Sequence, residues 1–185
     1  MAKEDSTAQF AERARSVQTV VAEAKDLAAV FEYAADITVK QGGDTLAAPG
    51  IQGKERDRLL EVCRAKGIEL ICGELRETAG RISTGLTGAD WGIAQTGTLV
   101  MDSKSEDIRL ASMLCETHVA FIKKSRIAPD AGTIEKELSK MMKASHGYLA
   151  FISGASRTAD IERVLTIGVH GPRELHVLII GEDGQ

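Results

Sequence analysis

The residue types best suited to chemistry lie in one short segment, FISGASRTADIE at residues 151–162. An apolar run there predicts a buried strand, and the two acidic residues after it predict the first turn of a helix at 159–165. A loop between strand and helix directs backbone N–H groups and the positive helix end to one place, which suits a phosphate or carboxylate. The residues predicted to hold such an anion are Gly154, Ser156, Arg157 and Thr158. Alternatively, the hydroxyls only cap the helix and Arg157 pairs with the nearby acids.

A second candidate is His170, which lies between glycines in GVHGPRELHVLII. A histidine in a tight turn can act as an acid, a base or a hydrogen-bond donor, because its ordinary pKa is close to neutrality. We therefore expect His170 to be a catalytic candidate and, with Gly171, a ligand contact. It could equally brace the loop, and whether it lies near Arg157 depends on the order of strands in the sheet.

A third candidate segment is LTGADWGIAQTGTLVM, in which glycines permit close backbone approach. Asp90 is a possible proton carrier there. The residues predicted to line a pocket are Thr87, Gly88, Gln95, Thr96, Gly97 and Thr98. The alternative is a tightly packed bend whose polar groups satisfy the local backbone. Trp91 is expected to be core packing.

Several function classes lose support from composition and motifs. The net charge is -4 and there is no basic block, so nucleic acid is not an expected partner. There is no HExxH motif, no Walker-type loop and no GxSxG motif. The three cysteines are not spaced as a chelating turn requires, so no metal or iron–sulfur site is expected within this chain. His118 and His176 fall within predicted strands and are interpreted as structural.

The elements that must position these residues alternate between strand and helix patterns. Residues 1–15 are expected to be a polar arm, loose or helical, and 16–185 one domain. The predicted strands are residues 17–22, 45–48, 68–72, 118–122, 148–152 and 175–180. The predicted helices are residues 27–37 after Asp26, then 54–66, 107–114, 133–143 with Thr133 as N-cap, and 159–165. Residues 91–101 are expected to form a hairpin turning near Thr96, beside the main sheet.

This pattern favours an α/β domain with a mostly parallel sheet. Aromatic residues are only 4% of the chain, so the core must be built from aliphatic side chains, as in strands covered by helices. No apolar run approaches the roughly 18 residues that a membrane-spanning helix needs. The cysteines are few and odd in number, which is typical of a reducing compartment, so we expect a cytoplasmic protein.

Taken together, TGADWGIAQTGTLVM, the following Arg109, SGASRTADIE and GVHGPRELHVLII resemble the LUD domain family, the lactate-utilization proteins of LutC type, from about residue 82 to residue 180. The resemblance implies a three-layer α/β/α fold similar to ribose-5-phosphate isomerase, glucosamine-6-phosphate deaminase and CoA transferases. It also implies a role in oxidising L-lactate to pyruvate together with separate subunits that carry iron–sulfur clusters. The chain differs from many relatives at Gln95, where they have Glu, at Ala155, where they have Pro, and at Cys115, in a stretch where they tend to have prolines.

The expected function is an accessory or regulatory subunit that binds a small carboxylate or phosphorylated ligand and docks on iron–sulfur partners. Gln95 favours binding over base catalysis, because an amide does not accept a proton near neutral pH. The first alternative is a free-standing isomerase- or transferase-like enzyme acting on a sugar phosphate or acyl-CoA, with His170 or Asp90 as proton carrier. The second is a pure interaction module whose glycine loops only shape a docking face.

Overall fold

A computed structural model describes residues 2–143, 148–158 and 166–181 of the chain. Within these residues, six parallel strands form the main sheet in the order β1-β12-β7-β4-β2-β3. These strands are β1 (Val20–Ala24), β2 (Thr45–Ala47), β3 (Glu69–Ile71), β4 (Thr84–Gly88), β7 (Thr117–Lys123) and β12 (Glu174–Ile180). The last strand of the chain therefore lies inside the sheet, between the first strand and β7.

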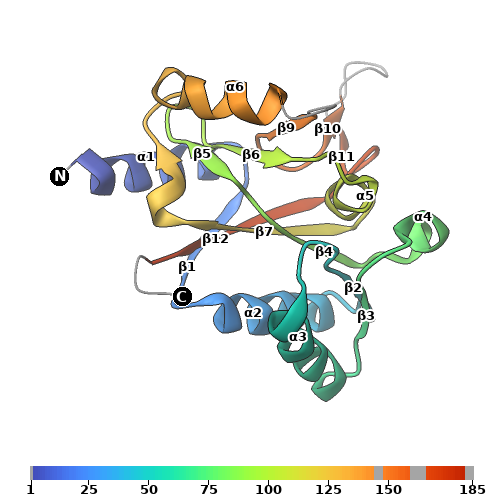
Figure 1. The fold of residues 1–185 in the computed structure, drawn as a ribbon. Helices are drawn as coiled ribbons and strands as arrows, with labels where there is room; N and C mark the ends of the chain where they lie inside the picture. The colour runs from blue at the N-terminus through green and yellow to red at the C-terminus, as the bar shows by residue number, and fades with distance from the viewer. Residues whose placement is uncertain (1, 144–147, 159–165, 182–185) are drawn as a thin grey trace.

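Helices cover both faces of the main sheet (Figure 1). One face carries α2 (Leu27–Lys40) and α3 (Gly53–Ala65). The other carries α1 (Ala2–Ser16), α5 (Glu106–Met113) and a second sheet, with α6 (Glu135–Lys143) beyond that sheet. This arrangement confirms the predicted three-layer α/β/α fold with a mostly parallel sheet.

The second sheet has the order β8-β5-β6-β9. Its strands are β5 (Trp91–Ile93), β6 (Thr98–Asp102), β8 (Ile127–Ala128) and β9 (Leu149–Ile152). The β5–β6 pair is antiparallel, which confirms the hairpin predicted for residues 91–101. A separate antiparallel pair joins β10 (Arg157–Thr158) to β11 (Thr166–Ile167). The short elements are α4 (Leu75–Thr78) and the 3-10 turns Ala79–Arg81, Lys124–Arg126 and Gly132–Ile134.

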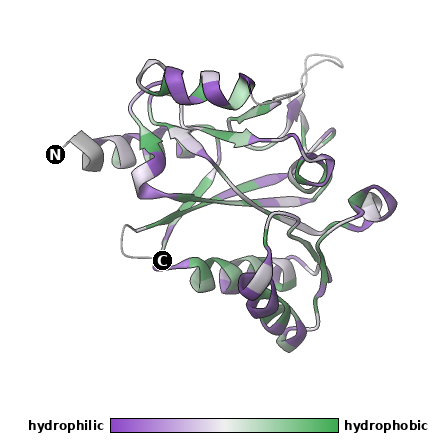
Figure 2. Ribbon diagram, viewed as in Figure 1, coloured by the Kyte–Doolittle hydropathy of each residue, from purple (hydrophilic) through white to green (hydrophobic). Residues whose placement is uncertain are grey.

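Alternating side chains on the central strands divide the core into two halves. In β12, Leu178 and Ile180 pack with the α2 and α3 side chains, whereas Val177 and Ile179 pack beneath the second sheet. Because successive strand residues point to opposite faces, one continuous apolar strand serves both layers. The hydropathy view shows α2 as largely hydrophobic and α6 as mainly hydrophilic, which fits their covered and outer positions (Figure 2).

Local sequence signals placed several element ends correctly. Asp26 caps α2, and its carboxylate accepts a hydrogen bond of 2.8 Å from the Ala29 N–H. Gly67 follows the end of α3 with a φ of 71°, in the left-handed region that glycine adopts at helix ends. The prediction that Thr133 caps the helix at 133–143 was wrong. Asp130 accepts the Thr133 N–H at 2.8 Å instead, and α6 begins at Glu135 after a 3-10 turn.

Two further predictions need correction. Thr84–Gly88 was not among the predicted strands, but it is β4, an inner strand of the main sheet. Residues 148–152 do form a strand, but β9 pairs antiparallel with β6 in the second sheet. The helix predicted at 159–165 lies outside the described residues.

The N-terminal segment, predicted as a polar arm, is the helix α1, packed against the domain. Phe10 and Ala14 are completely buried beneath the second sheet. Gly97 lies against this helix so closely that an added Cβ would stand 2.3 Å from the Ala14 nitrogen. α1 therefore contributes to the core although most of its residues are polar.

Replacing Phe10 by Ala should lower the free energy of unfolding by roughly 3 kcal/mol, because a fully buried aromatic side chain is lost and a cavity remains. Urea unfolding monitored by circular dichroism measures this change. Glu12→Ala is the control, since Glu12 is exposed on the same helix and its loss should cost less than about 0.5 kcal/mol. Equal stability of Phe10→Ala and the native chain would contradict the docking of α1.

Candidate functional site

A cleft opens where three parallel strands of the main sheet end. It has a volume of about 400 Å³ and lies past the carboxyl ends of β2, β4 and β7. Its lining residues are Gly50, Ile51, Thr87, Gly88, Asp90, Asp102, Lys104, Ser105, Ile108 and Phe121. Open α/β sheets bind their ligands at this edge, because the loops that follow parallel strands meet there. We call this site the main cleft.

Glycines in β4 set how closely the neighbouring elements approach the main cleft. A Cβ on Gly85 would stand 1.9 Å from the Ala111 carbonyl oxygen, so α5 lies directly on the strand. A Cβ on Gly88 would stand 3.0 Å from the Phe121 ring, which forms part of the cleft wall. β4 therefore needs glycine where the cleft is built, and this explains the glycine spacing noted in the sequence.

Two helices begin at the main cleft without a side-chain cap. α3 starts at Gly53, just after the lining residues Gly50 and Ile51, and its N-cap residue Gln52 makes no capping hydrogen bond. α5 starts after Ser105, which lines the cleft and also makes no capping hydrogen bond. The first N–H groups of a helix have no partner within the helix and carry partial positive charge. The start of α5 can therefore donate to an anion in the cleft, and the start of α3 lies two residues along the chain from the cleft lining.

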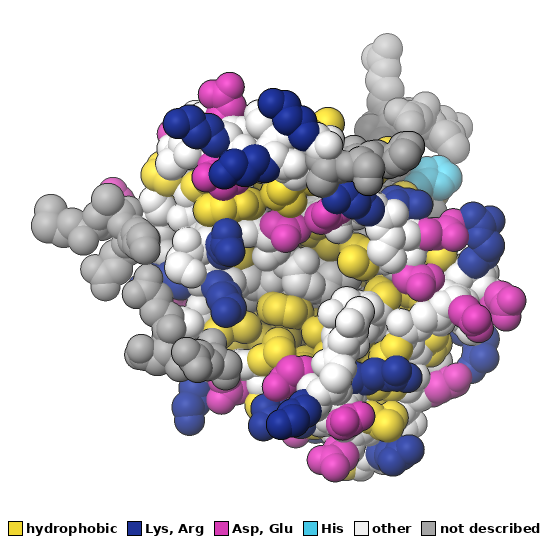
Figure 3. Space-filling model, in the orientation of Figure 1, with side chains coloured by type: hydrophobic (Ala, Val, Ile, Leu, Met, Phe, Trp, Pro, Cys, Tyr) yellow, Lys and Arg dark blue, Asp and Glu magenta, His cyan; other side chains and the backbone are white. Residues whose placement is uncertain are grey.

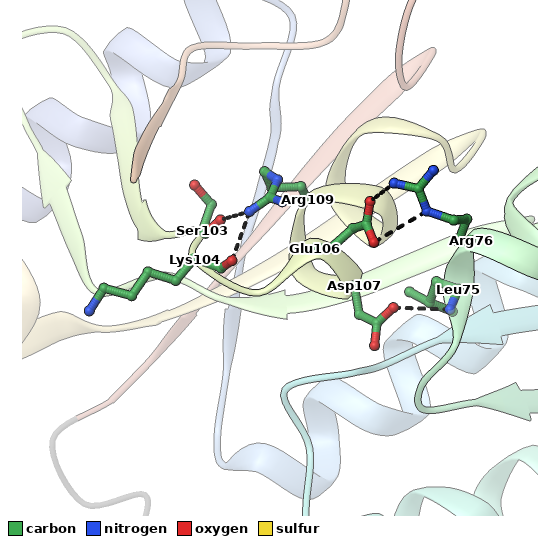
Figure 4. Close-up of polar contacts among 7 residues, drawn as sticks. All are labelled: Leu75, Arg76, Ser103, Lys104, Glu106, Asp107 and Arg109. Carbon is green, nitrogen blue, oxygen red and sulfur yellow. Dashed lines mark hydrogen bonds and ion pairs between the residues drawn. The ribbon is translucent and has the colours of Figure 1, made fainter. Parts of the chain in front are cut away.

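The loop before α5 is held by Arg109 (Figure 4). Its Nη1 donates to the carbonyl oxygens of Ser103 at 2.5 Å and Lys104 at 2.8 Å. Its guanidinium carbon lies 5.7 Å from the centre of the Tyr148 ring, and Ser103 donates its N–H to the Tyr148 carbonyl at 2.8 Å. These contacts fix the backbone that carries Lys104.

The acidic residues in the first turn of α5 bind partners on the side of the helix away from Lys104. Glu106 forms an ion pair with Arg76, and Asp107 accepts a hydrogen bond of 3.0 Å from the Leu75 N–H. The Lys104 side chain extends in the other direction (Figure 4). The ion pair with Arg76 lowers the pKa of Glu106. The first-turn carboxylates therefore hold α4, and Lys104 is the cation that lines the main cleft.

Two aspartates also line the main cleft. The Asp90 carboxylate accepts a hydrogen bond of 2.6 Å from the Asp102 N–H, which ties the start of β5 to the end of β6. Asp102 in turn lies 3.4 Å from the Lys104 ammonium group. Asp90 thus has a structural hydrogen bond and also faces the cleft, so its predicted role as a proton carrier stays a prediction.

A second hollow of about 480 Å³ adjoins the main cleft and shares Asp90 and Phe121 with it. Its charged lining residues are Lys123, Arg126, Lys140, Asp90 and Glu137. Trp91, expected in the core, is half-buried here, with the Arg126 guanidinium 4.9 Å from its ring centre. On this face, a hollow with hydrophobic side chains on its floor lies below α6, with basic and acidic side chains along its rim (Figure 3).

His170 does not share a cavity with Asp90. It lines a separate side cavity of about 230 Å³, together with Gly154, Ser156 and Gly171 from the predicted set. The buried His118 also lines this side cavity. The structure thus divides the predicted site residues, with Thr87, Gly88 and Asp90 at the main cleft and these four at the side cavity.

Arg157 lies at neither cavity. Its Nη2 donates to the Val17 carbonyl oxygen and lies 3.4 Å from the Gln18 side-chain oxygen. Arg157 and Thr158, predicted to lie in the loop before the helix at 159–165, form β10 and pair with β11. The guanidinium therefore ties the loop to the segment between α1 and β1.

The remaining predicted residues lie at the far end of the β5–β6 hairpin. Thr96 and Thr98 share a hydrogen bond of 2.7 Å, and Thr98 contacts the Ser153 hydroxyl at 2.7 Å. Gly97 packs on α1, and Gln95 donates its backbone N–H to the Pro129 carbonyl. None of Gln95, Thr96, Gly97 and Thr98 lines the cavities described above.

Sequence reasoning missed the residues that bring positive charge to the main cleft. Lys104 belongs to no motif, and Ser105 was not recognised as a helix start although two acidic residues follow it. Among the described residues, no cluster of three or more His, Cys, Asp or Glu side chains could hold a metal ion. In the same part of the chain, no helix is both long and apolar enough to span a membrane.

Comparison with known proteins finds one matching family. The model of the LUD domain matches residues 7–180. Lactate utilization protein C of Halalkalibacterium halodurans is 39% identical over 103 residues, 53% of this chain and 44% of that protein. The uncharacterized protein YkgG of Escherichia coli is 33% identical over 155 residues, 78% of this chain and 63% of that protein. The chain spans about half the length of the curated relatives it matches.

One solved structure shares the fold. The crystal structure of a DUF162 family protein from Deinococcus radiodurans superposes with a TM-score of 0.61 at 16% sequence identity. The match covers 98% of this chain and 99% of that one. At this identity the likeness concerns the fold alone.

Replacing Arg109 by Ala should loosen the loop that carries Lys104, because two carbonyl oxygens lose their donor. Hydrogen–deuterium exchange of the amides at 102–105 should become about tenfold faster. Arg76→Ala is the matched control, since Arg76 is exposed and contacts α5 only on its other side. Unchanged exchange in Arg109→Ala would show that the loop is held by other contacts.

Proposed function

Because this chain belongs to the LUD domain family, we propose that it is a LutC-type component of a lactate-utilization system and that it binds a small anion in the main cleft. The observation that carries the anion proposal is that Lys104 and Ser105, at the uncapped start of α5, line the main cleft, while the uncapped start of α3 follows its lining residues 50–51 in the chain. The lactate proposal draws its support from relatives named lactate utilization protein C. We propose a small carboxylate or phosphorylated acid as the ligand.

This cleft suits an anion better than the loop at 153–158, because Lys104 lines it whereas Arg157 is bonded to the Val17 carbonyl. Lys104 stands on a loop whose backbone Arg109 holds, so binding has to order only the lysine side chain. Backbone N–H groups bind carboxylate and phosphate oxygens alike. Asp90 and Asp102 oppose a highly charged ligand, which favours a small monoanion such as lactate or pyruvate over a polyphosphate.

We further propose that any electron transfer occurs on partner subunits that carry iron–sulfur clusters. Of the three cysteines, Cys63 and Cys115 are buried, and burial raises the pKa of Cys63 to about 11 and of Cys115 to about 12. Both thiols are thus protonated near neutral pH, whereas cluster ligands are thiolates. This favours a ligand-binding or regulatory part for the chain, with the redox chemistry elsewhere.

Asp90 supports an alternative in which the chain is itself an isomerase- or transferase-like enzyme. It is the carboxylate that lines both the main cleft and the adjoining hollow. Asp90→Asn keeps an oxygen that can accept the Asp102 N–H but removes the proton carrier. Turnover of a sugar phosphate or an acyl-CoA by the native chain, lost in Asp90→Asn, would favour the enzyme over the accessory subunit.

Lys104→Ala should weaken binding of pyruvate or L-lactate about tenfold, the value of a charge-assisted hydrogen bond. Isothermal titration of the purified chain measures this, with inorganic phosphate as a third probe. Lys40→Ala is the control, because Lys40 is exposed at the end of α2, away from the main cleft. If Arg157→Ala abolished binding and Lys104→Ala did not, the anion would belong to the loop at 153–158 and the main-cleft assignment would fail.

The physiological proposal has a separate test. Deleting the gene for this chain in its host should slow growth on L-lactate while leaving growth on pyruvate unchanged. Affinity purification of the tagged native chain from lactate-grown cells should recover proteins that contain iron–sulfur clusters. Normal growth of the deletion strain on L-lactate would contradict the lactate role, but it would not bear on the proposed anion site.

A further inference from the structure

His118 is a buried histidine that the proposed anion site does not use. It lies in β7 with 1% of its surface exposed. Its Nε2 lies 2.7 Å from the Thr87 hydroxyl. Burial lowers the pKa of His118 to about 4, so the ring is neutral at physiological pH. A neutral imidazole has one N–H donor and one nitrogen that accepts.

The neighbours of Thr87 decide which nitrogen accepts. The Thr87 hydroxyl donates toward the Met101 sulfur at 3.7 Å, and it has only one proton to give. In this arrangement the oxygen of Thr87 accepts from His118, and the ring proton is assigned to Nε2. Nδ1 keeps its lone pair and has no hydrogen-bond partner among the described residues.

The side cavity is a small hollow lined by apolar and uncharged polar side chains. His118 is one of its lining residues, and Ile152, Pro172 and Leu175 supply apolar wall. Ser112, Ser156 and His170 add polar groups, and no Lys, Arg, Asp or Glu side chain occurs among the described lining residues. The volume of about 230 Å³ is below that of drug-sized pockets. Such a cavity suits a small uncharged molecule.

The side cavity is kept open by backbone packing. A Cβ on Gly171 would stand 3.0 Å from the Ser156 Cβ, so glycine leaves room between the two loops. The Ser156 N–H donates to the Pro172 carbonyl at 2.9 Å, and the Ser156 carbonyl accepts the Gly168 N–H at 3.0 Å. These bonds hold the wall that faces His118 in place.

We propose that the side cavity is a second binding site, distinct from the main cleft, for a small uncharged molecule that donates a hydroxyl or amide N–H to His118 Nδ1. The apolar walls hold the rest of the molecule. His170 and Ser156 lie at this site and can offer further hydrogen bonds. The same chemistry rejects carboxylates, because no cationic side chain occurs among the described residues that line the cavity.

A pair of probes of the same shape tests the donor requirement. 2-Propanol has a hydroxyl that can donate to Nδ1, whereas acetone can only accept. Titration of each into the uniformly 15N-labelled chain, followed by the long-range 1H–15N signals of the His118 ring, gives both the affinity and the atom involved. We expect 2-propanol to shift Nδ1 and to bind about tenfold more tightly than acetone. Equal binding of the two probes, or no shift of Nδ1, would overturn the proposal.

Two variants test the cavity and the acceptor nitrogen of His118 separately. Ser156→Leu should fill the side cavity and abolish binding of both probes, and Ser125→Leu, at an exposed serine outside the cavity, should not. His118→Phe should make the two probes bind equally. Should His118→Phe fail to fold, the probe ratio in the native chain and the Ser156→Leu result decide alone. Unchanged binding in Ser156→Leu would contradict the site.

Discussion

Gly85 allows the last turn of α5 to lie directly on β4, with the Ala111 carbonyl where a Cβ would otherwise stand. This one contact fixes the height of the helix above the sheet. The start of α5, at Ser105 and Ile108, lines the main cleft, and its end, at Ser112 and Met113, lines the side cavity. Any larger residue at Gly85 would displace both walls together. The two cavities therefore depend on the same packing.

The two cavities differ in their chemistry because of the charges that each receives. The main cleft collects helix starts, Lys104 and two aspartates at the carboxyl edge of the sheet, where solvent can reach them. The side cavity receives a buried neutral histidine and hydroxyl groups. Thr87 connects them, because its side chain lines the main cleft and its hydroxyl bonds to His118. A charged ligand and an uncharged one can thus occupy neighbouring parts of one small domain.

Much of the fold followed from local patterns. The cap at Asp26, the glycine after α3 and the hairpin at 91–101 are all set by residues close together in the sequence. β4 was not foreseen as an inner strand, because the reason for its glycines is contact with Ala111 and Phe121, which are distant in the chain. Glycine is a poor strand former unless such a contact requires it.

The site was harder to predict than the fold for the same reason. Arg157 had the right chemistry for an anion, but it bonds to Val17, a partner 140 residues away. Lys104 carried no motif, and only the ends of three parallel strands and the brace from Arg109 bring it to the main cleft. His118 was correctly expected to be structural in part, since it is buried within β7, but its free nitrogen depends on Thr87 and Met101.

The anion site proposed for the main cleft depends on the backbone N–H groups at the starts of α3 and α5. The most direct measurement is the change in backbone amide chemical shifts during titration of the native chain with pyruvate. We expect the largest changes at the N–H groups of residues 53–55 and 105–107. Changes confined to residues 153–158, with none at the two helix starts, would contradict it.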